Sequence, residues 1–168
     1  MVGPLLDGLE GRVRNGVLEL RGPTLLTCYE PAGEAGSGKD GDGWFSTGDL
    51  ARLDEHGLYI LGRADHVIIS GGENISPLEI ELVLENHPAV SMAAVFPEPD
   101  EEWGQSVHAL VVLKADAAAR PSTGDLQDFV RARLARFKVP RSIRIVESLA
   151  TTASGKLDRR LLSKLIDG

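Results

Sequence analysis

The sequence predicts an α+β fold in two parts: a small β-rich segment over residues 1–64 and an α/β sandwich with a mixed sheet over residues 65–168. Two observations support this division. The first part consists of short strand-like runs separated by turn residues. The second part combines apolar strand-like runs with stretches whose apolar residues recur every three or four positions, as on one face of a helix. Strands and helices in this irregular order favour helices packed against a small sheet.

Short strands account for the first part. Val17–Arg21 alternates apolar and charged side chains, as a half-buried strand does. Residues 31–43 hold five glycines and no large apolar side chain, which predicts a surface loop. Asp49–Leu53 and Leu58–Leu61 are expected to form a hairpin around turn-forming residues. A turn-rich piece of about 60 residues encloses little core, so we expect residues 1–62 to be the remnant of something larger.

The second part is expected to open with the strand Val67–Ser70, break at two glycines and restart as a helix over residues 77–86. Ser76 is predicted to cap this helix, with Glu79 completing a capping box. Proline at the first helical position fits, because its missing N–H would be unpaired there anyway. The predicted apolar face is Leu78, Leu82 and Val83, with Glu81 and Glu85 elsewhere.

The remaining elements follow the same two periodicities. Their expected order is a strand over Val90–Phe96, an acidic loop over Pro97–Glu102, a central strand over Val107–Leu113, a helix after Ser122 with Leu126, Phe129, Val130 and Leu134 on one face, a strand over Ile143–Val146, and a last helix with Leu157, Leu161, Leu162 and Leu165 on one stripe. Trp103, Gly104 and Gln105 are expected to anchor a loop.

Composition excludes several classes of protein. No apolar run approaches the roughly 18–20 residues of a membrane helix, and no signal peptide is recognisable at the N-terminus. Cys28 is the only cysteine, so neither a disulfide framework nor a cysteine metal site is expected, and a cytoplasmic setting is the default. The four histidines lack the spacing of metal ligands, so we expect no metal site in this chain.

The charge distribution is uneven. A net charge of −7 argues against nonspecific nucleic-acid binding. Residues 66–128 hold two basic side chains against eleven acidic ones, whereas residues 129–164 hold ten basic side chains against two acidic ones. The basic segment is either a solvated helix face or a surface that meets phosphates.

Four separated motifs cover most of the chain: Ser46–Asp49 (STGD), Gly62–Asp65 (GRAD), Gly71–Asn74 (GGEN) and Thr151–Arg159 (TTASGKLDR). Each is weak in isolation, because Thr-Gly-Asp and paired glycines are common in turns. In this order and spacing, they resemble the adenylate-forming enzymes, the superfamily of acyl- and aryl-CoA synthetases, luciferases and peptide-synthetase adenylation domains. The form of the glycine motif looks most like CoA ligases of the o-succinylbenzoate–CoA ligase type.

The resemblance implies a role for each residue near the first two motifs. Thr47 and Asp49 would bind ATP or AMP, with the aspartate accepting hydrogen bonds from both ribose hydroxyls. Arg63 would contact the ribose or the phosphates through its planar fork. Asp65 would be the hinge about which residues 65–168, a mobile C-terminal lid domain, swing between two catalytic orientations.

The glycine motif and the basic segment would serve the acceptor. Gly71, Gly72 and Glu73 resemble the loop that lines the tunnel for the pantetheine thiol of CoA, where glycines allow close approach. Lys138 and Arg141 are assigned to the phosphates of the CoA nucleotide, against the alternative of simple solvation.

The last motif would supply the catalytic residue. Lys156 resembles the lysine that bridges the substrate carboxylate and the α-phosphate during adenylation, as a flexible ammonium on a glycine-flanked loop can. The family usually has proline and arginine where Ala150 and Thr151 stand, a departure that leaves the lysine in place.

The resemblance therefore implies the C-terminal part of an ATP-dependent acid–CoA ligase that uses ATP, Mg²⁺ and CoA. Its partners would be the remainder of the N-terminal adenylation domain and a small carboxylic acid. These 168 residues lack the family's Ser/Thr/Gly-rich phosphate loop, so we expect no tightly bound cofactor and no activity from this chain alone. The alternatives are an adenylation domain that loads a carrier protein and a stand-alone, non-catalytic binding module.

Overall fold

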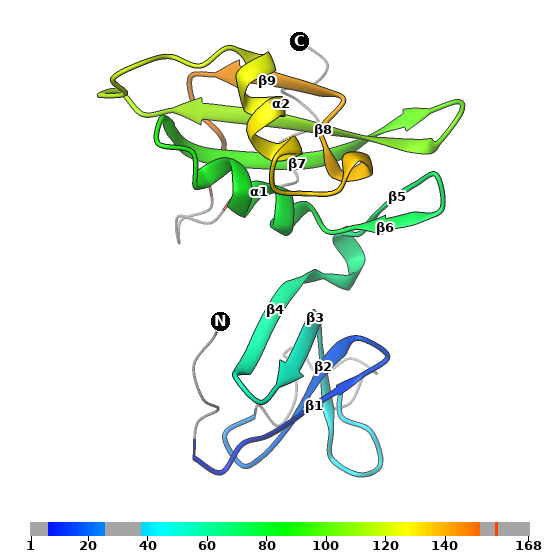
Figure 1. Ribbon diagram of the computed structural model, residues 1–168. Coiled ribbons are helices and arrows are strands. Elements are labelled where there is room, and N and C mark those ends of the chain that lie inside the picture. The colour runs from blue at the N-terminus through cyan, green and yellow to red at the C-terminus, as the bar shows by residue number, and fades with distance from the viewer. Residues whose placement is uncertain (1–6, 26–37, 152–156, 158–168) are drawn as a thin grey trace. The chain divides into compact units, whose positions relative to one another are not determined.

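The computed structural model describes residues 7–25, 38–151 and 157. Contacts divide the chain into two compact units, Met1–Val67 and Ile68–Gly168 (Figure 1). The fold class is α+β, as the sequence predicted, with a first unit of strands and a second unit of helices on a mixed sheet. The contact boundary follows Val67, whereas the sequence placed the boundary after residue 64.

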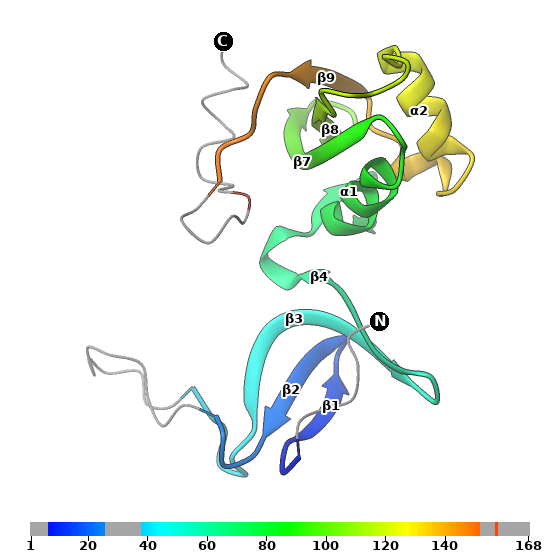
Figure 2. The ribbon, with the colours of Figure 1, turned by 90° about the vertical axis from the view of Figure 1, so that its left-hand side faces the viewer.

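The first unit is a four-stranded antiparallel meander, in the order β1 (Glu10–Arg14), β2 (Val17–Arg21), β3 (Phe45–Asp54) and β4 (Gly57–Arg63). The predicted strand at Val17–Arg21 and the predicted hairpin are both present. β3 pairs with both of its neighbours through irregular registers, and Figure 2 shows its strong bend. Bulges of this kind bend a strand and redirect its side chains. A short 3₁₀ turn, η1 (Ala64–His66), follows β4.

The second unit places two helices on one face of the three-stranded sheet β7-β8-β9. Strands β7 and β8 are antiparallel, whereas β8 and β9 are parallel, so the sheet is mixed and the predicted central strand is central. The elements are β5 (Ile68–Ser70), β6 (Glu73–Ile75), α1 (Pro77–Glu85), β7 (Val90–Asp100), β8 (Gly104–Leu113), α2 (Thr123–Arg131), the 3₁₀ turn η2 (Arg136–Lys138) and β9 (Ser142–Val146).

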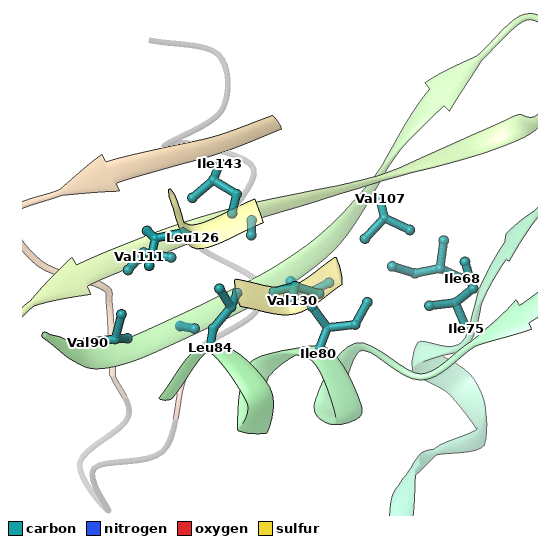
Figure 3. Close-up of a cluster of buried hydrophobic side chains, with 13 residues drawn as sticks. Ile68, Ile75, Ile80, Leu84, Val90, Val107, Val111, Leu126, Val130 and Ile143 are labelled. Carbon is teal, nitrogen blue, oxygen red and sulfur yellow. The ribbon is translucent and has the colours of Figure 1, made fainter. Parts of the chain in front are cut away.

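The main core lies between the helices and the sheet. Figure 3 shows Ile80 and Leu84 of α1 beside Val130 of α2, with Ile68 and Ile75 of the β5–β6 hairpin at the end near Val107. A second cluster covers the opposite face of the sheet and includes Ala94, Phe96, Leu110 and Leu149, with Leu157 packed against it. Of the predicted last helix, only Leu157 lies within the described residues.

The predicted capping box at the start of α1 is wrong. The side chain of Ser76 makes no capping hydrogen bond. Glu79 instead pairs with Lys138, with 2.6 Å between Oε2 and Nζ. A capping box does form at α2, where Ser122 Oγ accepts from the Asp125 N–H and the Asp125 carboxylate accepts from the Ser122 N–H. The local sequence pattern predicted where the helix begins, but it did not predict that Glu79 pairs with Lys138.

The predicted apolar face of α1 is wrong at Leu82 but right at Val83, which is partly buried against the main core. Ile80, Glu81 and Leu84 are buried, whereas Leu82 is 51% exposed. The carboxylates explain the rotation, because α1 packs along the free edge of β7. Glu81 accepts the N–H of Val95 at 2.8 Å, and Glu85 accepts the N–H of Ala93 at 3.1 Å. A buried N–H without an acceptor is costly, so the acidic side chains turn towards the sheet.

The predicted acidic loop at Pro97–Glu102 is shorter than expected. Pro97–Asp100 continues β7 and pairs with the start of β8, leaving a turn over residues 101–103. Pro97 and Pro99 occupy the edge positions that follow Ala93 and Val95 in the alternation of the strand. Proline has no N–H to pair, so it is tolerated where the backbone faces away from the neighbouring strand.

Candidate functional site

In the first unit, the arginine and the aspartate of the first two motifs lie together. Asp49 on β3 is directly opposite Arg63 on β4. Nη1 of Arg63 donates to the Thr47 carbonyl at 2.9 Å and contacts Oδ1 of Asp49 at 3.4 Å. Thr47 Oγ1 donates to the Leu18 carbonyl and accepts the Asp49 N–H, each at 3.0 Å. The strand pairing thus brings together residues that are sixteen positions apart in sequence.

Gly48 makes room for this cluster. Its φ is +73°, and a Cβ at this position would lie 2.9 Å from Nη2 of Arg63. The guanidinium therefore lies against bare backbone, at a position where L side chains are strained. The glycine of Thr-Gly-Asp is required by the arginine of Gly-Arg-Ala-Asp.

Asp65 completes the cluster from the other side. Nε of Arg63 donates to Asp65 Oδ1 at 3.1 Å, and Nη2 contacts Oδ2 at 3.4 Å. The hydrogen bond from Arg63 lowers the pKa of Asp65 below its ordinary value, and the same bond raises the pKa of Arg63. Both side chains are exposed to solvent. One guanidinium thus joins the Thr47–Asp49 turn to the segment that ends the unit.

In the second unit, the glycine motif is the tip of the β5–β6 hairpin, here called the glycine hairpin (residues 68–75). Gly71 and Gly72 have φ values of +58° and +84°, as the two central residues of a type I′ turn require. The Gly71 N–H donates to the Trp103 carbonyl at 3.0 Å. A Cβ on Gly71 would lie 2.6 Å from Cε3 of Trp103. The expected anchoring role of Trp103, Gly104 and Gln105 is confirmed by this contact and by Gln105, which accepts the Ile69 N–H at 2.8 Å.

The glycine hairpin forms one wall of an open groove of about 1060 Å³. The other walls carry cationic and aromatic side chains from the region between α2 and β9. Phe137 is 43% exposed and Trp103 is 51% exposed, which is unusual for such large apolar groups. The lining residues are Ser70, Gly71, Glu73, Trp103, Ser106, Val107, Gln127, Arg131, Arg136, Phe137, Val139, Pro140 and Arg141.

The two basic residues assigned to phosphates occupy different environments. Arg141 lines the groove and forms an ion pair with Asp100, whose carboxylate is largely shielded from solvent. The Asp100 carboxylate accepts the N–H groups of Trp103 and Glu102, and these bonds, the Trp103 one foremost, lower its pKa. Lys138 is paired with Glu79 and does not line the groove.

Comparison with known proteins shows which proteins this chain resembles. Residues 79–156 match the model of the AMP-binding enzyme C-terminal domain. The 2-succinylbenzoate–CoA ligase of Bacillus velezensis is 41% identical over 155 residues, which are 92% of this chain and 31% of that ligase. The chain is therefore similar to the C-terminal part of the AMP-binding, or adenylate-forming, CoA ligases, as the four motifs predicted.

Solved structures of adenylate-forming enzymes agree with this assignment. The o-succinylbenzoate CoA synthetase (MenE) of Bacillus subtilis, in complex with the acyl-adenylate intermediate OSB-AMP, matches with a TM-score of 0.84 and 37% identity, over 95% of this chain and 34% of that chain. The amide bond synthetase McbA of Marinactinospora thermotolerans matches with a TM-score of 0.85 and 30% identity, over 95% of this chain and 35% of that chain. The chain spans about a third of the length of these relatives.

The motifs singled out in the sequence are thus distributed over both units. The first unit carries Thr47, Asp49, Arg63 and Asp65, and the second carries the glycine hairpin. Lys156 lies outside the described residues, so the structure gives no geometry for it. No helix in the described part of the chain is long and apolar enough to cross a membrane, and no group of three or more metal-ligand side chains occurs there.

Sequence reasoning missed most of the groove. Arg131, Arg136 and Phe137 were not singled out, although all three lie in the basic segment of residues 129–164. The signal was the aromatic residue next to Lys138 in the run Phe-Lys-Val-Pro-Arg. An aromatic ring among cations at the surface is typical of a site for a base and its phosphates.

Proposed function

We propose that this chain serves as the C-terminal part of an AMP-forming acid–CoA ligase. The complete ligase would join a carboxylate to the α-phosphate of ATP, releasing pyrophosphate. The thiol of CoA would then attack the acyl carbon of the adenylate, with AMP as the leaving group. What supports this most is that two constellations of different chemistry lie on two separate units, whose boundary follows Val67, two residues after Asp65.

The first constellation suits a nucleotide. The Asp49 carboxylate can accept two neighbouring ribose hydroxyl protons, and Thr47 fixes the Asp49 backbone through its hydroxyl. The Arg63 guanidinium uses Nη1, Nε and, more weakly, Nη2 on its neighbours, and its remaining N–H groups can donate to a ribose or phosphate oxygen. The Mg²⁺ that accompanies ATP would be held mainly by the rest of the ligase and by the phosphates themselves.

The second constellation suits CoA. The groove offers an exposed aromatic ring for a base and three arginines for phosphates. Arg136 makes no ion pair with any residue that the structure describes, so its charge is available to a ligand. Gly71 and Gly72 allow a pantetheine arm to approach backbone, and Glu73 borders the same path. Lys138, which is committed to Glu79, would act on phosphates only after it leaves that carboxylate.

Two further roles belong to this proposal. Lys156 would bridge the carboxylate and the α-phosphate during adenylation, where its ammonium offsets charge that builds on both oxygens. Asp65 would be the hinge between the units, because a few torsions at a boundary can absorb a large rotation. The partner is an N-terminal adenylation domain that binds the carboxylic acid, and a cytoplasmic location gives access to ATP and CoA.

The roles proposed for this chain and for its partner domain can be tested by measuring adenylation and thioester formation separately. The 168-residue chain alone should release no pyrophosphate from ATP and a panel of carboxylic acids. A ligase assembled from this chain and an N-terminal adenylation domain should do so. In that ligase, Lys156→Ala should abolish adenylation yet spare thioester formation from a supplied acyl adenylate. Equal loss of both half-reactions would remove the role given to Lys156, and rapid pyrophosphate release by the chain alone would refute the need for a partner.

The acceptor is a separate question. A carrier protein bearing phosphopantetheine also favours a basic groove, and the likeness to an amide bond synthetase makes an amine a third acceptor class. Supplying the assembled ligase with CoA, a phosphopantetheinylated carrier or an amine separates these possibilities. The stand-alone module predicts binding of AMP or CoA with no turnover in any assembly.

A further inference from the structure

We propose that Gln105 is a positioning residue for the acceptor step. It docks the glycine hairpin on β8 and so fixes the tip of that hairpin at the groove. The inference rests on the proposed function for what the groove binds. The docking itself rests only on contacts within the second unit.

The base and the tip of the glycine hairpin are held in different ways. At the base, Ile68 and Ile75 are fully buried in the main core. Towards the tip, Ile69 is 56% exposed, so apolar packing does little there. The hairpin has three residues in each strand, and a two-stranded hairpin of this size is marginal without other contacts.

Two hydrogen bonds hold the tip. The Ile69 N–H donates to Oε1 of Gln105 at 2.8 Å, and the Gly71 N–H donates to the Trp103 carbonyl at 3.0 Å. Only the first of these depends on a replaceable side-chain acceptor. Trp103 is itself fixed by the Asp100 carboxylate, which accepts its N–H at 3.0 Å. Gln105 therefore ties a weak hairpin to β8, next to the turn whose Trp103 holds Gly71.

Gln105 can act on the groove only through the hairpin. It does not line the groove, whereas Ser70, Gly71 and Glu73 of the hairpin do. When the Ile69 N–H loses its acceptor, the tip is left with the Trp103 carbonyl and the ring contact beneath Gly71. The wall that carries Ser70, Gly71 and Glu73 then samples other orientations, and the space for the pantetheine arm is no longer preformed.

The test uses the 168-residue chain and three variants at one position. Gln105→Met keeps the length of the side chain and removes the acceptor, Gln105→Ala removes the side chain, and Gln105→Glu restores an acceptor oxygen. Amide hydrogen exchange of Ile69 and Gly71 reports docking, and calorimetric titration with CoA reports the groove. Gln127→Met is the matched control, because Gln127 lines the groove and donates to the Pro140 and Arg141 carbonyls without touching the hairpin.

We expect Gln105→Met and Gln105→Ala to speed exchange at Ile69 and Gly71 at least about tenfold and to weaken CoA binding about three- to tenfold. Gln105→Glu should recover both. Gln127→Met should leave exchange at Ile69 unchanged. Wild-type exchange in both acceptor-free variants would overturn the docking, and faster exchange with unchanged CoA affinity would overturn the positioning role. If the wild-type chain binds no CoA, the proposed acceptor site is wrong, while the exchange data still decide the docking.

Discussion

The guanidinium of Arg63 occupies the space that a side chain on Gly48 would fill, with Nη2 only 2.9 Å from where the Cβ would be. The Thr-Gly-Asp and Gly-Arg-Ala-Asp motifs, which are separate in the sequence, therefore pack against each other in the fold. The absence of a side chain at Gly48 lets the Arg63 guanidinium lie against the turn that presents Asp49. The first unit should therefore be sensitive even to the replacement of Gly48 by alanine.

Replacing Gly48 by alanine should destabilise the first unit and displace Arg63. The backbone at φ +73° alone costs about 1–2 kcal/mol for an L side chain, and the clash with Nη2 adds to this loss. The measurement is denaturant unfolding of the chain. Gly41→Ala is the control, since a Cβ there meets nothing within 4 Å. Equal stability of the two variants would contradict the contact.

Replacing Gly71 by alanine should be more damaging than replacing Gly72. Both residues have positive φ, so both changes carry the same backbone penalty of about 1–2 kcal/mol. Only at Gly71 would the new methyl group overlap the Trp103 ring, because a Cβ on Gly72 meets nothing within 4 Å. Thermal unfolding and CoA titration of the two variants measure the difference. Identical behaviour would show that Trp103 does not pack under the turn.

Replacing Glu81 by alanine should cost about 1–3 kcal/mol, because the Val95 N–H loses a buried acceptor. Glu81→Gln keeps an oxygen in reach of that N–H and should lose less. Denaturant unfolding gives both values. Leu82→Ala on the same helix is the control, since Leu82 is exposed. A larger loss at Leu82 than at Glu81 would restore the helix face first predicted from the sequence.

The stability of the second unit should fall as the pH drops below about 6.5. Burial lowers the pKa of His108, whose ring nitrogens contact Ser106 and Ser142 at 2.8 and 2.7 Å. Among the surrounding charges, Glu98 and Asp100 raise that pKa, whereas Arg141 and Arg144 lower it further. Below about pH 6.5, His108 binds a proton in the unfolded chain but not yet in the folded chain. Stability therefore decreases from about pH 6.5 down to the pKa of His108 in the folded state.

Thermal unfolding between pH 5 and 7.5 tests this dependence. His108→Gln should flatten it, because glutamine does not titrate. The carboxylates with lowered pKa values, such as Asp65 and Asp100, act in the same direction but only towards and below about pH 4. An unchanged slope between pH 5 and 6.5 in the variant would mean that another group controls it.

Arg136→Ala should weaken CoA binding about tenfold, and Lys138→Ala should weaken it less. Arg136 lines the groove, whereas Lys138 is already neutralised by Glu79 at 2.6 Å. Titration with CoA and with pantetheine separates the phosphate contribution, since pantetheine lacks the nucleotide. The reverse order of the two effects would favour the phosphate role predicted for Lys138 from the resemblance.

The features that could be predicted from the sequence are those set by residues close together in the chain. The paired glycines predicted a turn, and the alternation in Val17–Arg21 predicted a strand, because both depend on neighbours in the chain. Prediction from the sequence failed where a side chain pairs with a residue far away in the chain. Glu79 follows the spacing of a capping box, yet its partner Lys138 is 59 residues away. The buried face of α1 likewise depends on partners far along the chain, because Glu81 and Glu85 turn towards the N–H groups of Val95 and Ala93 on β7.

The free edge of β7 has one more consequence. Glutamates take the N–H groups of Ala93 and Val95, and Pro97 and Pro99 have none to offer. At these four positions a foreign strand would find no available N–H donor, which disfavours extension of the sheet by another chain along this stretch of the edge. If residues 65–168 swing as the proposed function requires, this edge would resist pairing with other chains whenever the motion exposes it to solvent.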